Sequence, residues 1–433
     1  MPTLRTENAL LIKNGHVIDP ASGQDGVADV LIEDGMVRHV GQNISAPAGA
    51  RVIDASGLFV APGFIDMHVH LREPGFEHAE TIESGSRAAA AGGFTSICPM
   101  PNTSPVNDSA TVTSYIAEKA RNKAIVNVFP IGAITKGSLG EELAAIGAMR
   151  EAGAVAISDD GRPVMNAQLM RRAMEYARGF NIPVINHCED LHLSAGGDMH
   201  EGLESVRLGL RGIPGCSEEV MVARDILLAE VTGARYHVAH ISSRHSVEMV
   251  QFAKTRGMAV TSEATPHHLD LADSDMKPYD SNYKMKPPLR SCGDVDAVLA
   301  GVVSGAIDAI ATDHAPHPGS EKMQEFEKCP FGILGLETAL GVTIERLIHP
   351  GKIPLKRFVE MFTVNPARIL GLNRGTFSTG APGDVTLFST QREWTYDVNK
   401  SFSKSRNSPY DGRTFRGGAV ATVVAGEVVW DCL

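Results

Sequence analysis

Between residues 63 and 312 the chain alternates short apolar runs with amphipathic segments, and this alternation constrains the fold more than any other feature. Eight runs have the length and composition of buried strands: 63–68, 94–100, 125–133, 154–158, 183–187, 236–240, 259–263 and 306–312. Six segments have helical apolar spacing: 81–91, 141–151, 168–178, 218–230, 246–256 and 295–303. Strands that alternate with helices form parallel sheets covered by their crossovers. The pattern predicts an α/β fold of the (β/α)8 TIM-barrel class, and by itself it also fits a doubly wound sheet of eight strands.

The two ends of the chain have a different pattern, made of short β-like runs beside glycines. The runs are 8–16, 28–33, 36–40 and 51–53 at the start, and 383–388, 419–424 and 428–430 at the end. Asp34-Gly35 is a hairpin turn signal between two of them. Neither group can bury a core alone, so we expect both termini to build one small β-sandwich-like domain. The expected division is 1–58 and 375–433 for this β-domain and 59–374 for the barrel.

Charge and composition exclude several classes of function. A net charge of −11 disfavours binding to a phosphate backbone, and no apolar run reaches the roughly 18 to 20 residues of a membrane span. The N-terminal MPTLRTENALLIKNG does not have the features of a signal peptide. The cysteines are scattered without a C-x-x-C pair: Cys98, Cys188, Cys216, Cys292, Cys329 and Cys432. We therefore expect a cytoplasmic protein without structural disulfides that binds neither nucleic acid nor membranes.

Imidazole and carboxylate side chains stand at the ends of five of the predicted strands. They are His68 and His70 at the end of the first, Asp159 and Asp160 after the fourth, His187 at the end of the fifth, His240 at the end of the sixth and Asp313 after the eighth. The carboxyl ends of barrel strands share one mouth, where barrel enzymes place their chemistry. These are the ligand types of zinc and similar divalent ions, and their number suffices for two ions that share a carboxylate. Local chemistry does not choose between Asp159 and Asp160.

Other reactive side chains have simpler interpretations. His237 begins the sixth strand and His314 follows Asp313, so we expect both to point away from the mouth. His267 and His268 are candidate hydrogen-bond partners of the ligands rather than ligands. Cys188 has no acid–base partner in its pattern and is a poor nucleophile candidate.

Nine motifs resemble a known family in order along the chain. They are PGFIDMHVHLREPG (62–75), PMPNTSPVND (99–108), SDDG (158–161), NHCED (186–190), YHVAHIS (236–242), TPHHL (265–269), KPPLR (286–290), ATDHAPH (311–317) and PFGILGLETAL (330–340). The chain resembles the type I dihydroorotases of the amidohydrolase superfamily over nearly its whole length. The resemblance implies reversible, metal-dependent cyclisation of N-carbamoyl-L-aspartate to dihydroorotate in de novo pyrimidine (UMP) biosynthesis.

The resemblance also implies roles for individual residues. One zinc ion would be bound by His68, His70 and Asp313 and a second by His187 and His240, with Asp160 bridging both. Asp313 would carry the proton between water and the ring nitrogen. The substrate contacts would be His70, Arg72, Asn102, Lys286, His317, Phe331 and Gly332. A guanidinium suits a carboxylate, so Arg72 would anchor the substrate's carboxylate.

The chain departs from the family at Lys286, where the motif usually has asparagine. Two outcomes fit this change: the ammonium enters the pocket and donates a hydrogen bond, or it turns outward and leaves the contact to water. Residues 318–328, rich in charge, fit either a mobile lid or a solvated loop.

Two rival functions stay open at this point, together with the protein's physical partners. One rival is another cyclic amidohydrolase of the allantoinase or dihydropyrimidinase type. Many such relatives, the hydantoinases among them, bridge the metals with a carboxylated lysine where this chain has aspartate. The other is a non-catalytic scaffold of aspartate carbamoyltransferase, which would be expected to lack metal ligands. We expect a homo-oligomer, with association with aspartate carbamoyltransferase as a further possibility.

Overall fold

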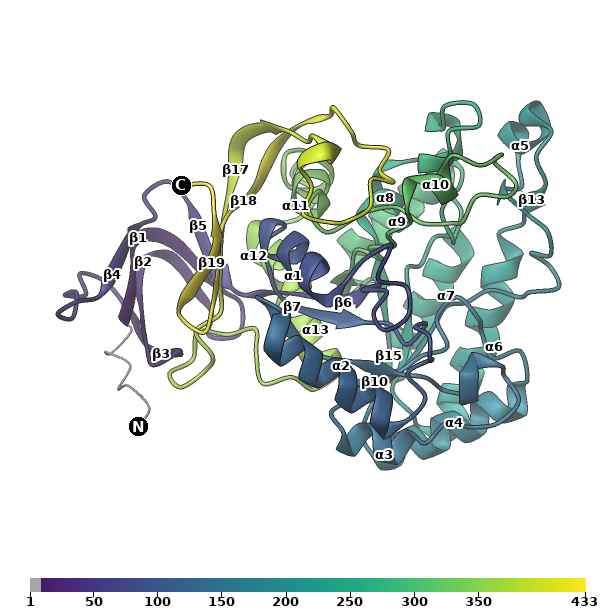
Figure 1. Cartoon of the computed structure of the whole chain (residues 1–433), viewed down its shortest axis with the longest axis horizontal. Helices are drawn as coiled ribbons and strands as arrows, with labels where there is room; N and C mark the ends of the chain where they lie inside the picture. The colour runs from purple at the N-terminus through teal and green to yellow at the C-terminus, as the bar shows by residue number, and fades with distance from the viewer. Residues whose placement is uncertain (1–8) are drawn as a thin grey trace.

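The computed structural model describes residues 9–433 and divides the chain into a β-sheet at one side and a larger barrel (Figure 1). Asn8, the first residue of the run 8–16, lies outside the described residues. The sheet contains strands from both the N-terminal and the C-terminal parts of the described chain. Within residues 9–433, no helix is both long and apolar enough to cross a membrane. All six cysteines are free thiols.

The terminal sheet has the order β19-β18-β17-β5-β1-β2-β3, with β4 beside β1. Its strands are β1 (Ala9–Asp19), β2 (Gln24–Glu33), β3 (Met36–Gly41), β4 (Arg51–Asp54), β5 (Phe59–Pro62), β17 (Val385–Thr395), β18 (Thr414–Val424) and β19 (Glu427–Asp431). β5 pairs antiparallel with β17, so the two ends of the chain meet there, as predicted. Asp34 and Gly35 have φ of 51° and 75°, the positive values that a type I′ hairpin turn requires.

The expected boundaries at 58 and 374 stay predictions. β5 lies in the terminal sheet, which extends the N-terminal share of the sheet to Pro62. The sheet also has an apolar cluster of its own, which includes Leu10, Ile32 and Leu387.

The barrel strands are parallel and close on themselves, which excludes the doubly wound alternative. In order they are β6 (Phe64–Val69), β7 (Phe94–Pro99), β8 (Asn127–Val128) with β9 (Ile131–Gly132), β10 (Ala156–Ile157), β11 (Val184–Asn186), β14 (Tyr236–Val238), β15 (Val260–Ala264) and β16 (Ala309–Ile310). β8 pairs with β7 and β9 with β10, so the run 125–133 supplies one barrel position in two pieces. Val69 pairs with His314, and the His70 amide donates to the His314 carbonyl at 2.9 Å, which closes the ring.

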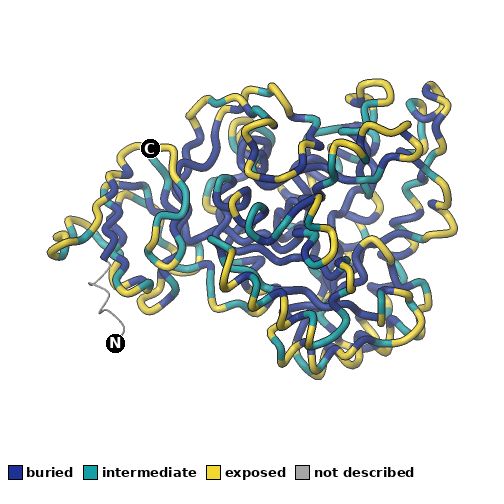
Figure 2. The backbone as a smooth tube through the Cα atoms, in the orientation of Figure 1, coloured by how far each residue is buried: buried dark blue, intermediate teal, exposed yellow. Residues whose placement is uncertain are grey.

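Helices surround the barrel, and buried residues concentrate in its interior (Figure 2). The main ones are α1 (Ile82–Ala91), α2 (Ala110–Lys123), α3 (Ile146–Glu151), α4 (Ala167–Gly179), α6 (Cys216–Thr232), α7 (Arg244–Thr255), α9 (Cys292–Ser304), α12 (Leu355–Phe362) and α13 (Val364–Leu370). Shorter elements are α5 (Leu203–Leu208), α8 (Pro266–Asp270), α10 (Gly319–Lys322), α11 (Ala339–Thr343), β12 (Met199–His200) and β13 (Gly212–Ile213). The six predicted helices are present, α3 starting five residues later than expected.

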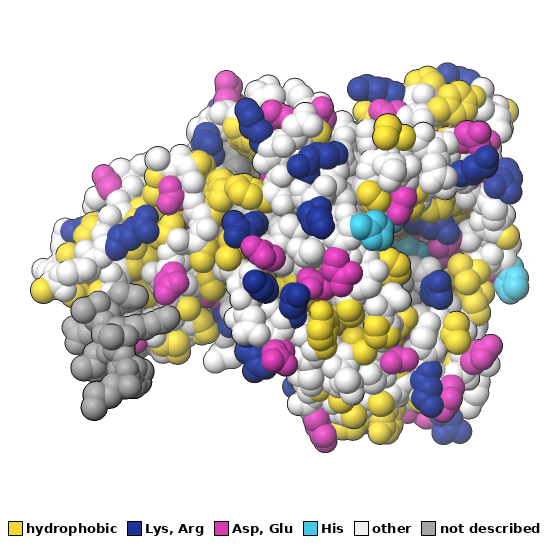
Figure 3. All heavy atoms as spheres, in the orientation of Figure 1, with side chains coloured by type: hydrophobic (Ala, Val, Ile, Leu, Met, Phe, Trp, Pro, Cys, Tyr) yellow, Lys and Arg dark blue, Asp and Glu magenta, His cyan; other side chains and the backbone are white. Residues whose placement is uncertain are grey.

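Helix α2 was not predicted. It buries only Thr113, Ile116 and Ala120, so its apolar periodicity is weak. By contrast, α1 has a strong start signal, since the Ser84 amide donates to the Thr81 hydroxyl at 3.1 Å. On the face in Figure 3, acidic and basic side chains are interspersed.

Candidate metal centre and substrate pocket

The structure brings all six predicted metal ligands together at the carboxyl end of the barrel. Each lies at or shortly after the end of a strand: His68 lies in β6 and His70 follows it, Asp160 follows β10, His187 follows β11, His240 follows β14 and Asp313 follows β16. All six are at most 5% exposed. Six buried titratable side chains in one place need charge partners, because burying an uncompensated charge is costly.

Asp160 lies at the centre of this cluster, within reach of four imidazoles. Its Oδ1 is 3.3 Å from His68 Nε2, 3.7 Å from His187 Nδ1 and 3.8 Å from His240 Nε2. Its Oδ2 is 3.5 Å from His70 Nε2. The two oxygens of this carboxylate are therefore placed to bind two ions, each held by different histidines.

Asp159, next in the chain, points elsewhere. It accepts from the backbone amides of Ile134 and Thr135 at 2.8 and 3.1 Å and from the Thr135 hydroxyl. Burial raises the pKa of Asp159 to about 6 despite these hydrogen bonds. Asp159 thus binds the neighbouring strand end, and Asp160 alone of the pair faces the histidines.

Asp313 completes a second group with His68 and His70. Its Oδ1 is 2.9 Å from His70 Nε2 and 3.5 Å from His68 Nε2. Burial acts to raise the pKa of Asp313, but His68 and His70 hold it below its usual range. Asp313 and His240 have positive φ, 46° and 31°, which is uncommon for residues other than glycine and occurs where a site dictates side-chain direction.

The donor set fits divalent ions. His68 with Asp160 and His240, and His68 with His70 and Asp313, each offer ligand atoms within 4.8 Å of one another. His68 Nε2 and Asp160 Oδ1 are buried and, although 3.3 Å apart, form no well-aligned hydrogen bond with each other or with another described residue. Buried polar atoms are rarely left unpaired, so a cation is the natural partner for these two.

Three polar side chains hold the histidine nitrogens that face away from the cluster. Glu263 Oε1 is 2.7 Å from His68 Nδ1, Asn102 Oδ1 is 2.9 Å from His70 Nδ1, and Glu189 Oε2 is 3.0 Å from His187 Nε2. Such partners orient metal-ligating imidazoles. The sequence analysis did not single out Glu263 or Glu189. Glu263 ends the predicted strand 259–263, and a glutamate at the end of an apolar strand is a signal of a buried functional carboxylate.

The other histidines considered in the sequence form different contacts. His237 is 3.2 Å from Glu263 and His314 is 3.4 Å from Glu80. His268 contacts Thr265 and the Pro287 carbonyl. His267 is buried, and within residues 9–433 neither it nor His268 hydrogen-bonds a predicted ligand.

A cavity of about 370 Å³ opens beside the cluster. Its lining includes most of the predicted substrate contacts, namely His70, Arg72, Asn102, Lys286, His317 and Phe331. Gly332 lies next to Phe331, where a Cβ would meet the Ala315 carbonyl oxygen at 2.5 Å, so the close approach of the chain requires glycine. The predicted metal and substrate residues therefore share one site.

Arg72 and His317 form a pair at one wall of this cavity. The Arg72 guanidinium donates to His317 Nε2 at 3.1 Å and to the Pro316 carbonyl at 3.1 Å. Burial and the Arg72 charge lower the pKa of His317 to about 2, so this imidazole is neutral and accepts from Arg72.

Lys286 also lines this cavity. Its ammonium is 2.7 Å from Glu189 Oε1, while the other oxygen of Glu189 contacts His187. The Lys286 ammonium is therefore paired with Glu189. It does not point freely into solvent, and its charge is not left unpaired in the cavity.

The segment 318–328 is tied to the pocket through α10. Lys322 is buried, and its ammonium donates to the carbonyls of Pro330 at 2.9 Å and Gly332 at 3.2 Å. Burial lowers the pKa of Lys322 to about 8. Whether this segment moves as a lid stays a prediction.

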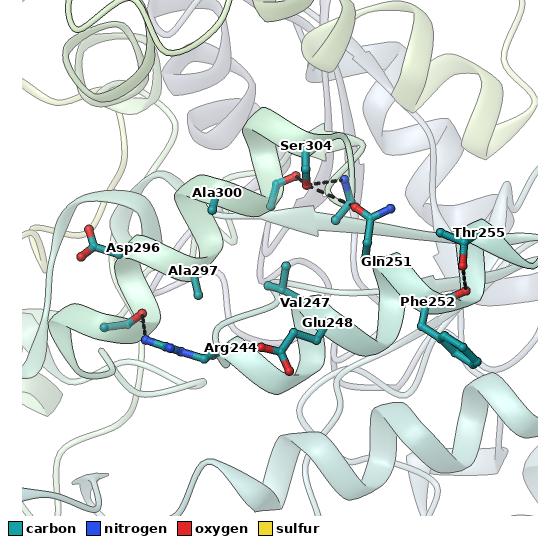
Figure 4. Close-up of a pocket in the computed structure, with 13 residues that line it drawn as sticks. Arg244, Val247, Glu248, Gln251, Phe252, Thr255, Asp296, Ala297, Ala300 and Ser304 are labelled. Carbon is teal, nitrogen blue, oxygen red and sulfur yellow. Dashed lines mark hydrogen bonds between the residues drawn. The ribbon is translucent and has the colours of Figure 1, made fainter.

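A larger cavity, about 670 Å³, lies on the outside of the barrel between α7 and α9 (Figure 4). Val247 and Phe252 of α7 and Ala297 and Ala300 of α9 line it, and Ser304 hydrogen-bonds Gln251. None of the groups of potential metal ligands found among residues 9–433 lies there. The chemistry-bearing side chains therefore gather at the barrel mouth.

Comparison with known proteins agrees with this geometry. A family model described as Dihydro-orotase-like matches residues 57–246. The chain is 70% identical over 421 residues to a dihydroorotase of Solibacter usitatus (strain Ellin6076), an alignment that covers 97% of this chain and 98% of that protein. It is 54% identical over 421 residues to a dihydroorotase of Citrifermentans bemidjiense (strain ATCC BAA-1014 / DSM 16622 / JCM 12645 / Bem), with 97% and 99% covered.

Solved structures confirm the fold. The L-hydantoinase (dihydropyrimidinase) from Arthrobacter aurescens superposes with a TM-score of 0.88 at 26% identity, covering 98% of this chain and 96% of that one. A dihydropyrimidinase from Brevibacillus agri NCHU1002 gives a TM-score of 0.84 at 24% identity, with 98% and 95% covered. The same fold thus occurs in a hydantoinase and in a dihydropyrimidinase.

Proposed function

This chain belongs to the dihydroorotase family, and we propose that it is a type I, zinc-dependent member that interconverts N-carbamoyl-L-aspartate and (S)-dihydroorotate in pyrimidine biosynthesis. The observation that carries the proposal is that Arg72 and His317, a pair suited to a carboxylate, line the same cavity as four of the six proposed metal ligands, His70, Asp160, His187 and Asp313. A ring substrate with a carboxylate needs both features.

The metal ligands in this proposal are the six buried side chains of the cluster. His68, His70 and Asp313 would hold one zinc ion, His187 and His240 the other, and Asp160 would contact both. When bound, the ions would polarise the attacked carbonyl and make water acidic enough to attack near neutral pH. Glu263, Asn102 and Glu189 keep the imidazoles turned toward the ions.

The protein's own groups then bind the substrate and move its proton. Arg72 anchors the carboxylate, and Asn102, His317 and the Phe331-Gly332 turn complete the pocket. Asp313 takes the proton from the attacking water and delivers it to the ring nitrogen as the amide bond breaks. In the biosynthetic direction the same steps run in reverse, and water leaves as the ring closes.

The rival functions are less compatible with this site. An enzyme for uncharged rings, such as a dihydropyrimidinase or allantoinase, has no use for a guanidinium that lines the cavity beside the proposed metal ligands. A non-catalytic scaffold has no need for six buried ligands with oriented nitrogens. Cytoplasmic location, homo-oligomerisation and association with aspartate carbamoyltransferase stay predictions.

Substrate preference tests the proposed function directly. Zinc-loaded protein should turn over dihydroorotate far better than dihydrouracil, hydantoin or allantoin. In Arg72→Met this preference should fall by about 100-fold, because a buried charge-assisted hydrogen bond to the carboxylate is lost. Measured kcat/KM for the four rings gives the ratio. Preference of the parent protein for an uncharged ring would refute the assignment.

Lys286 offers a prediction specific to this chain. In Lys286→Met, Glu189 loses the ammonium 2.7 Å from its Oε1 and keeps only its contact with His187, so its negative charge is less compensated beside an anionic substrate. We expect KM for dihydroorotate to rise by about tenfold. The matched control is Lys136→Met, which breaks an equally short pair with Glu142 on the surface and should change KM less than about twofold. Tighter binding by Lys286→Met would mean instead that the ammonium obstructs the substrate.

A further inference from the structure

The C-terminal part of the chain reaches back over the barrel mouth. Between β17, which ends at Thr395, and β18, which begins at Thr414, the segment 396–413 leaves the terminal sheet and extends toward α8 and α10 (yellow in Figure 1). We call this segment the C-terminal crossover. It lies against loops that follow the first and last barrel strands, the same loops that carry Arg72 and His317.

Buried serines of the crossover bind these loops. The Ser405 hydroxyl donates to the Ala79 carbonyl at 2.8 Å, Ser403 donates to Glu80, and Ser401 donates to Glu337 at 2.7 Å. All three serines are at most 8% exposed. The crossover is therefore packed into the mouth by specific polar contacts and does not lie loosely over it.

Asn407 makes the contacts that matter most for the pocket. Its Nδ2 donates to the carbonyls of Ala315 at 2.8 Å and Gly332 at 3.0 Å, and its Oδ1 accepts from the His317 amide at 3.0 Å. The side chain is 2% exposed. One amide thus joins the two chain segments, around 315–317 and around 332, that form one side of the cavity.

The contacts continue from Asn407 to the carboxylate anchor. The His317 backbone is held by Asn407, and the His317 ring accepts from the Arg72 guanidinium at 3.1 Å. Arg72 also donates to the carbonyl of Pro316, within the same short stretch. Moving residues 315–317 would therefore displace both partners that fix the guanidinium.

We propose that Asn407 is a positioning residue for substrate binding: from the C-terminal crossover it holds residues 315–317 and Gly332 so that Arg72 and His317 form a ready-made carboxylate site. This inference rests on the proposed function, since it takes the cavity to bind a carboxylated ring. Only an amide satisfies the arrangement, because two carbonyls need donors and one amide N–H needs an acceptor. Preorganised groups bind a ligand with less loss of conformational freedom.

Asn407→Ala should raise KM for dihydroorotate by about 10- to 100-fold while kcat changes less than about threefold. Zinc content should be unchanged, since Asn407 contacts none of the proposed ligands. Asn399→Ala is the matched control, because it removes an exposed asparagine from the same crossover and should alter neither constant. Hydrogen exchange of peptides spanning 312–334 should accelerate in Asn407→Ala only.

The outcomes separate the inference from the proposed function. If the parent protein does not turn over dihydroorotate, the proposed function fails, and hydrogen exchange still reports whether Asn407 holds the loops. Faster exchange without a rise in KM, or an equal fall in kcat for all ring substrates, would overturn the positioning role. If Asn407→Ala does not fold, Asn407→Asp, which keeps an acceptor for His317 but has no N–H for the two carbonyls, must show the same selective rise in KM.

Discussion

Replacing Asp313 with asparagine should lower kcat for dihydroorotate by about 10³-fold while the protein stays folded and substrate still binds. Asparagine has nearly the same shape and keeps an oxygen for His70, which lies 2.9 Å from the native carboxylate. It cannot take a proton from water and pass it to the ring nitrogen. The steady-state constants in both directions, with zinc content measured on the same samples, test this expectation.

Two comparisons make this result specific to Asp313. Asp296→Asn changes an exposed aspartate on α9, far along the barrel exterior, and should leave kcat unchanged. Asp313→Asn that retains both zinc ions and more than a tenth of the parent kcat would exclude Asp313 as the proton carrier. If zinc content falls instead, assays with excess zinc separate loss of metal from loss of proton transfer.

The adjacent pair Asp159 and Asp160 provides the second large effect. In Asp160→Asn we expect zinc content to fall from two ions to one or none, and turnover to fall by more than about 100-fold. Even residues behind the ligands typically cost 10- to 100-fold, so loss of a group that lies within 4 Å of four imidazoles should cost more. Elemental analysis and kcat measure the two effects.

Asp159→Asn is the matched control, one residue away with the same chemical change. It weakens hydrogen bonds to Ile134 and Thr135, so we expect a loss of about 1–3 kcal/mol in the free energy of unfolding. Both zinc ions should stay bound. The assignment is wrong if Asp159→Asn releases zinc while Asp160→Asn keeps it.

Much of the architecture could be predicted because its signals are local. Apolar runs separated by helical spacing marked the eight barrel positions, and the positive φ of Asp34 and Gly35 agrees with the hairpin signal. The helix α2 was missed because it buries too few side chains to create a clear period. The closure between Val69 and His314 joins residues too distant in sequence for any local pattern to reveal.

The candidate site divides in the same way. His68, His187, His240 and Asp313 could be found as strand-end residues, because parallel strands bring their carboxyl ends to one mouth. The choice between Asp159 and Asp160 depends on the directions of two side chains in a loop, and the chemistry of the sequence does not fix these directions. From the sequence, the choice of Asp160 rested on family resemblance alone. In the structure, Asp160 points toward the histidines and Asp159 does not.

The sequence by itself thus determined the alternation of strands and helices, the shared β-domain and the gathering of imidazoles and carboxylates at the strand ends, since these follow from periodicity and chain direction. Only the tertiary structure closed the strands into a barrel, through the pairing of Val69 with His314. Only the tertiary structure paired Lys286 with Glu189, set Glu263 behind His68 and brought Asn407 to the loop of His317. Each of these contacts joins residues far apart in the chain through hydrogen bonds of a few ångströms. Such contacts depend on side-chain direction after folding, which no local pattern of residues encodes.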